Sequence, residues 1–422
     1  MKITIHRGAD QIGGCITEIC SESGNKIFID LGHNLPSESD EPDKYDNPTT
    51  LSTLLEGVSA VVYTHNHGDH AGFFAHIPEH IPQYMGAMGR EVMQNTLEEQ
   101  FNTAQRAGRT QRAEEVEGAI ARLNKFRTYA TARTFHIGDI AITPYFVSHS
   151  AADAHMLLVE CDRKRVLHTG DFRDHGFTGK GLTPTLARIG QVDALIIEGT
   201  TLSRDGSASK SEYQIQQEML ELMGRYKNIF VVCSSTNFDR LAGLHKASQE
   251  FRGRPFVCDT YQKQQLDTLT THLGKCSPLY IIKNARQMSL KSESLHRQMF
   301  KNGFTMIVRN NSTFRKWINF LKEHIDLNET LCIYSQYHGY LDEQPTLREF
   351  VDSLGCKVEY IHTSGHASPE AIEEVCRTLK PRSAIIPIHK DATSDFFHTL
   401  NLPDELKAKI IAADTAQLGI PI

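Results

Sequence analysis

Three histidines and an aspartate within six residues constrain this chain more than any other feature of its sequence. Residues 58–63 form an apolar run typical of a buried strand, and the segment T-H-N-H-G-D-H follows directly, with four candidate metal ligands: His65, His67, Asp69 and His70. Imidazole and carboxylate groups together favour zinc or a similar divalent ion. The first two histidines are expected to share a face at the strand end, and Gly68 is expected to turn the chain so that the other two ligands reach a second ion. A group of surface histidines is the alternative interpretation, which the spacing after a strand disfavours.

The composition is that of an ordinary globular protein. The 422 residues are 40% hydrophobic and 23% charged, which excludes wholesale disorder and fibrous repeats. Charged and turn residues interrupt every apolar run before it could span a membrane, and strand-like alternation from residue 1 leaves no room for a signal peptide. Nine cysteines without a C-x-x-C pair predict reduced thiols and no cysteine-based zinc site. We therefore predict a cytoplasmic protein that does not enter a membrane.

The chain is long enough for two or three domains, and its pattern changes twice. Short strands dominate residues 1–200, whereas residues 201–349 alternate apolar strands with helical stretches, as in a parallel α/β unit. Residues 350–422 return to the style of the first part. The middle segment carries 20 Lys and Arg against 15 Asp and Glu, although the whole chain has a net charge of −6. We expect 201–349 to be a domain inserted into another one formed by 1–200 and 350–422.

The pattern of further acidic and histidine residues along the sequence resembles that of the metallo-β-lactamase fold. That family has an aspartate at the end of an early strand, and Asp30 in F-I-D-L-G matches it as a residue that orients the metal ligands. A later histidine after a strand is matched by His149 in V-S-H-S, and a bridging aspartate by Asp171 in H-T-G-D-F-R. A lone histidine or aspartate is more typical of a core residue. The order of both residues after the 64–70 cluster carries the resemblance.

The carboxyl-terminal part resembles the β-CASP branch of this fold, which processes nucleic acids. Glu198 in E-G-T matches the acid of its motif A, His366 in H-T-S-G-H-A matches the histidine of motif B, and His389 matches the histidine of motif C. The H-x-S-G-H-A form is most similar to the ribonuclease J family, and the resemblance covers essentially the whole chain. It implies an α/β fold, namely a metallo-β-lactamase αββα sandwich with an inserted α/β β-CASP domain.

Three departures from the family pattern accompany this resemblance. Lys390 follows the motif C histidine where the family usually has glycine, and E-G-T replaces a commoner acid-Ser-Thr form. Only 33 residues follow His389, so the extra carboxyl-terminal domain of ribonuclease J enzymes is expected to be missing. We expect a compact relative, and leave open whether it is a monomer or a homodimer.

The resemblance implies a two-ion centre that hydrolyses phosphodiester bonds with an activated water. The ions would be zinc, with manganese as the alternative. By carry-over from the family, one ion is held by His65, His67 and His149, the other by Asp69, His70 and His389, and Asp171 bridges them. The catalytic residues would be Asp69, Glu198 and His366. His366, paired with Glu198, would either protonate the leaving oxygen or bind a phosphate without proton transfer.

The substrate contacts are expected at strand ends and in the motif B loop, with these candidates: Ser234, Ser335, His362, Ser364 and Gly365. Ordinary helix caps explain the first two equally well. Ten basic residues and one acid between Lys275 and Lys322 would suit a polyanion. Aromatic residues there would stack on bases or fill the core: Phe304, Phe314, Trp317 and Phe320.

We predict a nuclease for single-stranded nucleic acid, with RNA favoured over DNA and with exonucleolytic and endonucleolytic cleavage both open. A hydrolase of small esters or thioesters is the alternative from another class.

Overall fold

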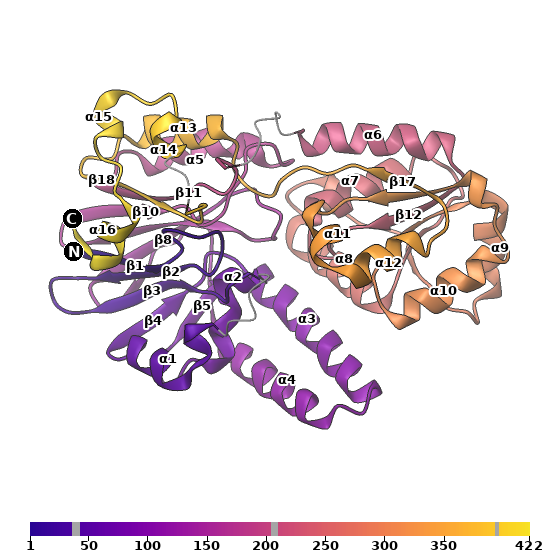
Figure 1. The fold of residues 1–422 in the computed structure, drawn as a ribbon, viewed down its shortest axis with the longest axis horizontal. Coiled ribbons are helices and arrows are strands. Elements are labelled where there is room, and N and C mark those ends of the chain that lie inside the picture. The colour runs from indigo at the N-terminus through magenta and orange to yellow at the C-terminus, as the bar shows by residue number, and fades with distance from the viewer. Residues whose placement is uncertain (36–42, 204–209, 393–395) are drawn as a thin grey trace. The chain divides into compact units, whose positions relative to one another are not determined.

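Two β-sheets form a sandwich in the part of the chain that holds the histidine cluster. The structure is a computed structural model and describes residues 1–35, 43–203, 210–392 and 396–422. The first sheet has the order β19 (Ile420–Pro421), β1 (Lys2–Arg7), β2 (Ile16–Cys20), β3 (Lys26–Leu31), β4 (Val58–Val62), β5 (Gln83–Gly86), β6 (Arg127–Tyr129). The second has the order β18 (Ala384–Ile388), β11 (Ala194–Glu198), β10 (Lys164–His168), β9 (His155–Cys161), β8 (Ile140–Phe146), β7 (Phe135–Ile137). β1 and β19 pair, so both chain ends lie in this sandwich (Figure 1).

Both sheets are apolar on both faces, which explains their continuous hydrophobic strands. Along β3, Ile27 and Ile29 face the core between the sheets, whereas Phe28 contributes to a separate core on the outer face. Along β11, Ile196 faces the core between the sheets, whereas Leu195 contributes to a separate core on the outer face of the second sheet.

Helices cover the outer faces of the two sheets, which completes an αββα arrangement. The helices of this part are α1 (Pro48–Leu54), α2 (Gly68–Ala71), α3 (Ala87–Arg106), α4 (Thr110–Leu123), α5 (Leu182–Ile189), α13 (Pro369–Leu379), α14 (Phe396–Thr399), α15 (Asp404–Lys407) and α16 (Ala413–Leu418). The polar stretch after residue 88, expected to be one or two surface helices, forms α3 and α4. Several of their buried side chains join the core outside the first sheet, namely Met93, Leu97, Val116 and Leu123.

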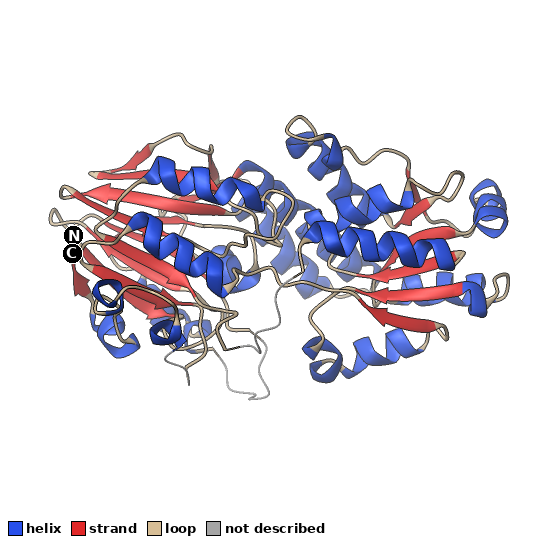
Figure 2. Cartoon of the chain, turned by 90° about the horizontal axis from the view of Figure 1, so that it is seen from above, coloured by secondary structure: helices blue, strands red, loops and turns tan. Residues whose placement is uncertain are grey.

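A third sheet belongs to a second compact unit. Its order is β14 (Ala285–Gln287), β13 (Phe256–Cys258), β15 (Phe304–Val308), β12 (Asn228–Val232), β16 (Thr330–Tyr334), β17 (Lys357–Tyr360), and all of its pairs are parallel. Helices flank this sheet (Figure 2): α6 (Glu212–Arg225), α7 (Phe238–Ser248), α8 (Thr260–Leu273), α9 (Glu293–Asn302), α10 (Ser312–Lys322), α11 (Gly339–Glu343) and α12 (Pro345–Asp352). This is the alternating α/β pattern that the sequence predicts.

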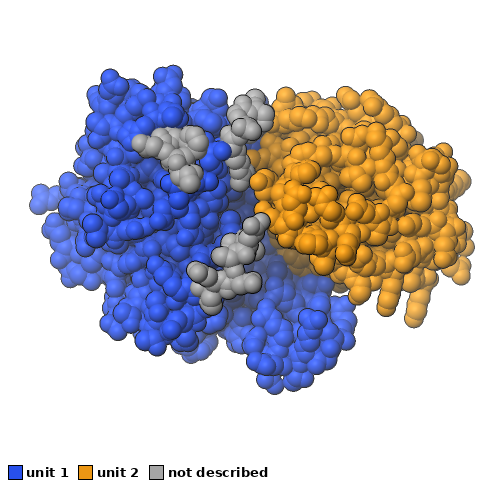
Figure 3. Space-filling model, in the orientation of Figure 1, with its two compact units in different colours: residues 1–208, 365–422 blue, residues 209–364 orange. Residues whose placement is uncertain are grey.

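The two units, coloured in Figure 3, comprise residues 1–208 with 365–422 and residues 209–364. The second unit extends beyond the expected end at residue 349. The reason is β17, which pairs in parallel with β16 from Leu331↔Lys357 to Tyr334↔Tyr360 and so belongs to the inserted sheet. Within the described residues, no helix is both long and apolar enough to cross a membrane.

Strand direction explains why distant parts of the sequence meet in the first unit. In the second sheet, β8, β10, β11 and β18 all run the same way, because β9 is antiparallel to both of its neighbours. In the first sheet, β1, β3 and β4 run the same way, with β2 antiparallel between β1 and β3. The carboxyl ends of the parallel strands therefore lie at one edge of each sheet.

Candidate metal centre

One carboxylate lies at the centre of the histidine cluster. Asp171, three residues beyond β10, is 2% exposed. Its Oδ2 lies 3.2–3.8 Å from the Nε2 atoms of four imidazoles: His70, His149, His65 and His389. A single oxygen within reach of four nitrogens has the position that a bridging ligand requires.

The remaining candidate ligands divide into two groups around this carboxylate. On one side, one ligand atom each of His65, His67 and His149 lies within 4.8 Å of the others, and His149 Nε2 is 3.3 Å from His67 Nδ1. On the other side, Asp69 Oδ2 is 3.1 Å from His389 Nε2 and 3.8 Å from His70 Nε2. The structure thus brings together all seven residues that the sequence analysis named as ligands.

The turn after His67 forms differently from the expectation. Gly68 has no positive φ, and a Cβ there would meet nothing within 4 Å. The chain instead begins helix α2 at this residue, which places Asp69 and His70 in its first turn. The glycine that the site does require is Gly32, where an added Cβ would lie 1.8 Å from the carbonyl oxygen of Asp69.

Asp30 orients one side of the cluster through hydrogen bonds to His70 and Thr64. It is fully buried at the end of β3, with a φ of 60°. Its Oδ2 accepts from His70 Nδ1 at 2.8 Å and from Thr64 Oγ1 at 2.8 Å, and its Oδ1 accepts from the Thr64 backbone N–H at 2.7 Å. A carboxylate on Nδ1 leaves the lone pair of Nε2 facing the cluster, as in metal sites.

The other histidines are oriented through Nδ1 as well. The Gly365 carbonyl lies 2.6 Å from His149 Nδ1, and Thr200 Oγ1 lies 2.7 Å from His389 Nδ1. Thr64 Oγ1 lies 3.1 Å from His65 Nδ1. The sequence analysis did not identify Thr64 and Thr200, although both flank predicted site residues.

The electrostatics of the cluster separate its two sides. Burial lowers the pKa of His65 and of His149 well below the ordinary value, which favours neutral imidazoles with available lone pairs. Burial opposes charge on His70 as well, but the acidic groups around it, Asp171 first and then Cys15, Asp30 and Asp69, together outweigh burial and raise the pKa of His70. Burial likewise opposes charge on Asp171, yet His389 and His70 hold its pKa well below the ordinary value. The carboxylate side therefore favours positive charge.

Several buried polar atoms here lack hydrogen-bond partners among the described residues, namely His65 Nε2, His70 Nε2 and Asp171 Oδ1. Such atoms are costly in a protein interior unless something binds them. Their clustering, with nitrogen and oxygen donors in two sets, fits divalent ions.

A second acid–histidine pair lies beside the cluster. Glu198, the last residue of β11, is fully buried, and its Oε2 is 3.0 Å from His366 Nδ1. Glu198 also accepts hydrogen bonds from the Phe172 N–H at 2.9 Å and from Thr200 Oγ1 at 2.7 Å. The His366 side chain is 19% exposed, and its Nδ1 lies 3.6 Å from Asp171 Oδ2. The structure thus brings together the pair that the motifs predict.

The departure E-G-T has a steric reason. A Cβ at Gly199 would lie 2.6 Å from the ring of the buried Phe397. A serine in this place would therefore clash with the packed aromatic side chain.

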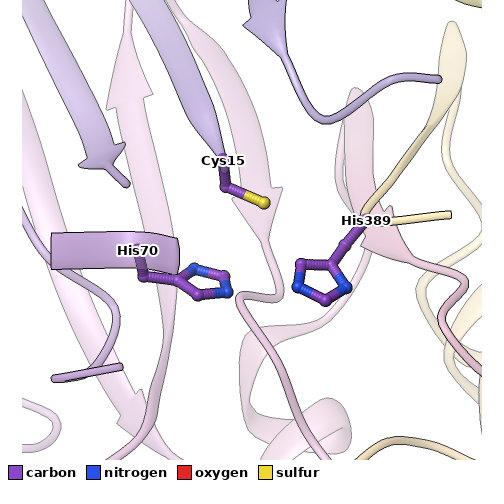
Figure 4. Close-up of side chains that lie close together, drawn as sticks. All are labelled: Cys15, His70 and His389. Atoms are coloured by element: carbon purple, nitrogen blue, oxygen red, sulfur yellow. The ribbon is translucent and has the colours of Figure 1, made fainter. Parts of the chain in front are cut away.

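Cys15 also lies in the cluster, although the sequence analysis found no cysteine-based zinc site. One ligand atom each of Cys15, His70 and His389 lies within 4.8 Å of the others (Figure 4). Burial raises the pKa of the Cys15 thiol well above its ordinary value. A single cysteine outside any C-x-x-C pair gives no spacing signal that could have identified it.

The predicted substrate residues divide between the two units. Ser234, Ser335 and His362 follow the neighbouring parallel strands β12, β16 and β17, so they lie along one edge of the third sheet. Ser364 ends this unit, and Gly365 begins the last segment of the first unit. Ser234 is exposed.

Ser335 departs from the expectation of a substrate contact. It is 2% exposed, and its hydroxyl donates to Ile361 O at 2.5 Å and accepts from the Arg240 guanidinium. Its hydroxyl therefore serves the interior of the second unit.

Of the two roles left open for the four aromatic residues, base stacking or core packing, the structure gives core packing to two of them. Phe304 and Phe314 are fully buried in the core of the second unit, so they cannot stack on a nucleic acid. Trp317 and Phe320 are partly buried and pack against the same core.

Two family models match this chain. The beta-lactamase superfamily domain matches residues 42–234, and the Zn-dependent metallo-hydrolase RNA specificity domain matches residues 353–396. The latter range contains three of the histidines described above, His362, His366 and His389.

The chain is also similar to curated proteins named ribonuclease J. It is 22% identical over 415 residues to that of Helicobacter pylori strain 26695, and 23% identical over 418 residues to that of strain J99. Each match covers 92% of this chain and 56% of the relative, so the chain spans about half the length of these relatives.

A crystal structure of a protein of unknown function from Enterococcus faecalis V583 shares the fold, with a TM-score of 0.72 and 19% identity. The match covers 94% of this chain and 95% of that one. Together with the family matches, it confirms the predicted fold class.

Proposed function

Because the chain is a metal-dependent hydrolase of the metallo-β-lactamase superfamily, of the ribonuclease J-like β-CASP type, we propose that it cleaves phosphodiester bonds of single-stranded RNA. The observation that carries this proposal is the constellation around Asp171, with four imidazole nitrogens within 3.8 Å and the His366–Glu198 pair beside it.

The proposed centre takes two zinc ions. His65, His67 and His149 would hold one, and Asp69, His70 and His389 would hold the other, with the Asp171 carboxylate lying between the two groups. When bound, such ions supply a nucleophile at neutral pH and stabilise the charge that develops on the phosphoryl oxygens. The Nε2 atoms of His65 and His70 support this assignment, because they are buried beside Asp171 without a hydrogen bond among the described residues.

In the proposed mechanism, His366 acts on the leaving group. Glu198 accepts from His366 Nδ1 and so fixes the imidazole, which leaves Nε2 to donate a proton to the departing 3′-oxygen. Two further hydrogen bonds, from Phe172 N and Thr200 Oγ1, hold the Glu198 carboxylate in place. Thr200 also contacts His389, so one hydroxyl positions both the acid pair and a metal ligand.

The second unit carries basic side chains that would suit a polyanion, at the amino ends of β13 and β14 and so at the sheet edge opposite to Ser234, Ser335 and His362. A pocket of about 520 Å³ in this unit is lined by four basic side chains: Arg252, Arg254, Lys283 and Arg286. Three of them are exposed, as phosphate contacts require. RNA is favoured over DNA because the domain matched at residues 353–396 is described as an RNA specificity domain.

The test is cleavage of 5′- and 3′-labelled single-stranded RNA and DNA of one sequence, with zinc or manganese added. Wild type is expected to cut RNA, Asp69→Ala to lose cleavage, and His366→Asn to retain its ions while the rate falls by roughly 10²–10⁴-fold. Asp193→Asn, a buried carboxylate outside the cluster, is the matched control and should cleave like wild type. Product lengths separate single-nucleotide release from internal cuts. A protein that holds its ions and cuts neither nucleic acid would refute the proposal and direct attention to esters and thioesters.

A further inference from the structure

We propose that Cys15 is a ligand of the ion held by Asp69, His70 and His389, so that this position of the centre contains sulfur. The inference rests on the metal centre proposed above and adds a ligand and a metal preference to it.

The thiol lies among the donors of that position. Cys15 Sγ and one ring nitrogen each of His70 and His389 are all within 4.8 Å of one another, and in Figure 4 the sulfur lies beside the space between the two imidazoles. All three residues are at most 1% exposed. His70 Nε2 is buried with no hydrogen-bond partner among the described residues, which independently indicates that something binds at this point.

Strand direction places Cys15 there. Residues 8–15 connect β1 to the antiparallel β2, so this turn lies at the same edge as the end of β3. Cys15 directly precedes β2, and its position is therefore set by the sheet that also positions Asp30.

Backbone hydrogen bonds fix the turn to the ligand segments on two sides. Cys15 N–H donates to the Asp69 carbonyl at 2.8 Å, and Gly32 N–H donates to the Cys15 carbonyl at 3.1 Å. His389 N–H donates to the Gly8 carbonyl at 2.6 Å. Gly8 has a φ of 101°, and a Cβ at this residue would lie 3.2 Å from Cys15 Sγ. The thiol is thus held in register with both Asp69 and His389.

His389 adopts a backbone conformation that a non-glycine residue takes only under constraint. Its φ is 49°, directly after β18. Such conformations cost free energy and persist where the surrounding structure imposes them, commonly at functional sites. The conformation directs this imidazole toward the same point as the thiol.

Binding of the ion by Cys15 is coupled to loss of the thiol proton. When a divalent ion binds, the S–H bond of Cys15 breaks, a sulfur–metal bond forms, and the proton passes to solvent. Thiolate ligands favour zinc and cobalt over manganese, which prefers oxygen ligands. Cys15 would therefore make this position selective for zinc, whereas the position of His65, His67 and His149 has no sulfur donor among the residues grouped there.

Packing in the core is the competing role for a buried cysteine, and Cys161 provides the matched control. Cys161 is 8% exposed and lies in the same core between the sheets, but it belongs to none of the metal-ligating groups found among the described residues. A spectroscopic change that follows Cys15 and not Cys161 separates ligation from packing.

The experiment loads cobalt(II) into wild type, Cys15→Ala, Cys15→Ser and Cys161→Ala, and records near-ultraviolet absorption. Wild type and Cys161→Ala should show a thiolate-to-cobalt charge-transfer band that both Cys15 variants lack. In chelator competition, Cys15→Ala should weaken binding of the second zinc ion by at least about tenfold, with little change for manganese.

Each further outcome is decisive. Equal bands and equal zinc affinities in wild type and the Cys15 variants would overturn the inference while leaving the metal centre intact. A wild type that binds no cobalt or zinc would overturn both. If the Cys15 variants do not fold, X-ray absorption on zinc-loaded wild type decides, because a sulfur ligand gives a shell at about 2.3 Å, and its absence contradicts the assignment.

Discussion

Replacing Asp30 by Asn should weaken zinc binding at the position of Asp69, His70 and His389 without unfolding the protein. Asn tolerates the left-handed conformation that Asp30 adopts, with its φ of 60°. The amide oxygen can still accept from the Thr64 N–H, which now donates to Oδ1 at 2.7 Å. The amide NH₂ then faces His70 Nδ1, where the carboxylate oxygen accepts at 2.8 Å in the native protein.

The magnitude follows from the tautomer of His70. An NH₂ group on Nδ1 requires Nδ1 to accept, which puts the proton on Nε2 and removes the lone pair that faces the cluster. For Nε2 to keep its lone pair, the proton of His70 must return to Nδ1. The Nδ1–H and the amide NH₂ are then two buried donors that face each other, at a cost of about 1–3 kcal/mol. Since 1.4 kcal/mol is a factor of ten, zinc at this position should bind roughly 5–150-fold more weakly.

The assay is competition with a chromophoric chelator, combined with thermal unfolding of the metal-free protein. Asp193→Asn is the control, because Asp193 is a buried carboxylate that accepts from Arg165 N at 2.9 Å and Arg382 Nη1 at 3.2 Å, away from the cluster. Its zinc affinity should equal that of wild type. An Asp30→Asn protein that binds both ions as tightly as wild type would refute the reasoning.

Three further perturbations probe other parts of the molecule. Burial lowers the pKa of His168 from its ordinary value of 6.5 to about 4. Between these two pH values the unfolded chain binds more protons than the folded one, so the free energy of unfolding decreases as the pH is lowered. His168→Asn should remove about 3 kcal/mol of this loss between about pH 6.5 and 4, measured by urea unfolding; an unchanged pH dependence would contradict it. Glu212→Ala leaves the Arg240 guanidinium, 1% exposed, without its carboxylate partner and should destabilise the second unit by about 3–5 kcal/mol in urea, whereas a loss below 1 kcal/mol would argue against a buried pair. Gly32→Ala should displace the Asp69 backbone and lower zinc binding from two ions to one by metal analysis, and retention of both ions would show that the turn can yield.

The ligand positions could be predicted because each follows a recognisable strand. His389 directly follows β18, and His149 and Asp171 lie three residues beyond β8 and β10. The shared direction of these strands brings their ends to one edge. Spacing along the sequence and position in space therefore agree.

Features that depend on pairing between distant strands could not be predicted. The run K-V-E-Y at 357–360 has the same pattern whichever sheet it joins, and only its pairing with β16 assigns it to the second unit. Cys15 reaches the cluster because β2 is antiparallel, which a single cysteine does not reveal. Phe304 and Phe314 show the same limit, because an aromatic side chain in a basic segment looks identical whether it is buried or exposed.

The central claim is that the cluster around Asp171 is a two-ion hydrolytic centre. Anomalous diffraction at the zinc edge from crystals of the zinc-loaded protein tests it most directly. We expect two peaks per chain on either side of the Asp171 carboxylate, one contacted by His65, His67 and His149, and the other by Asp69, His70 and His389. A single peak away from Asp171, or none in protein shown to be saturated with zinc, would contradict the account.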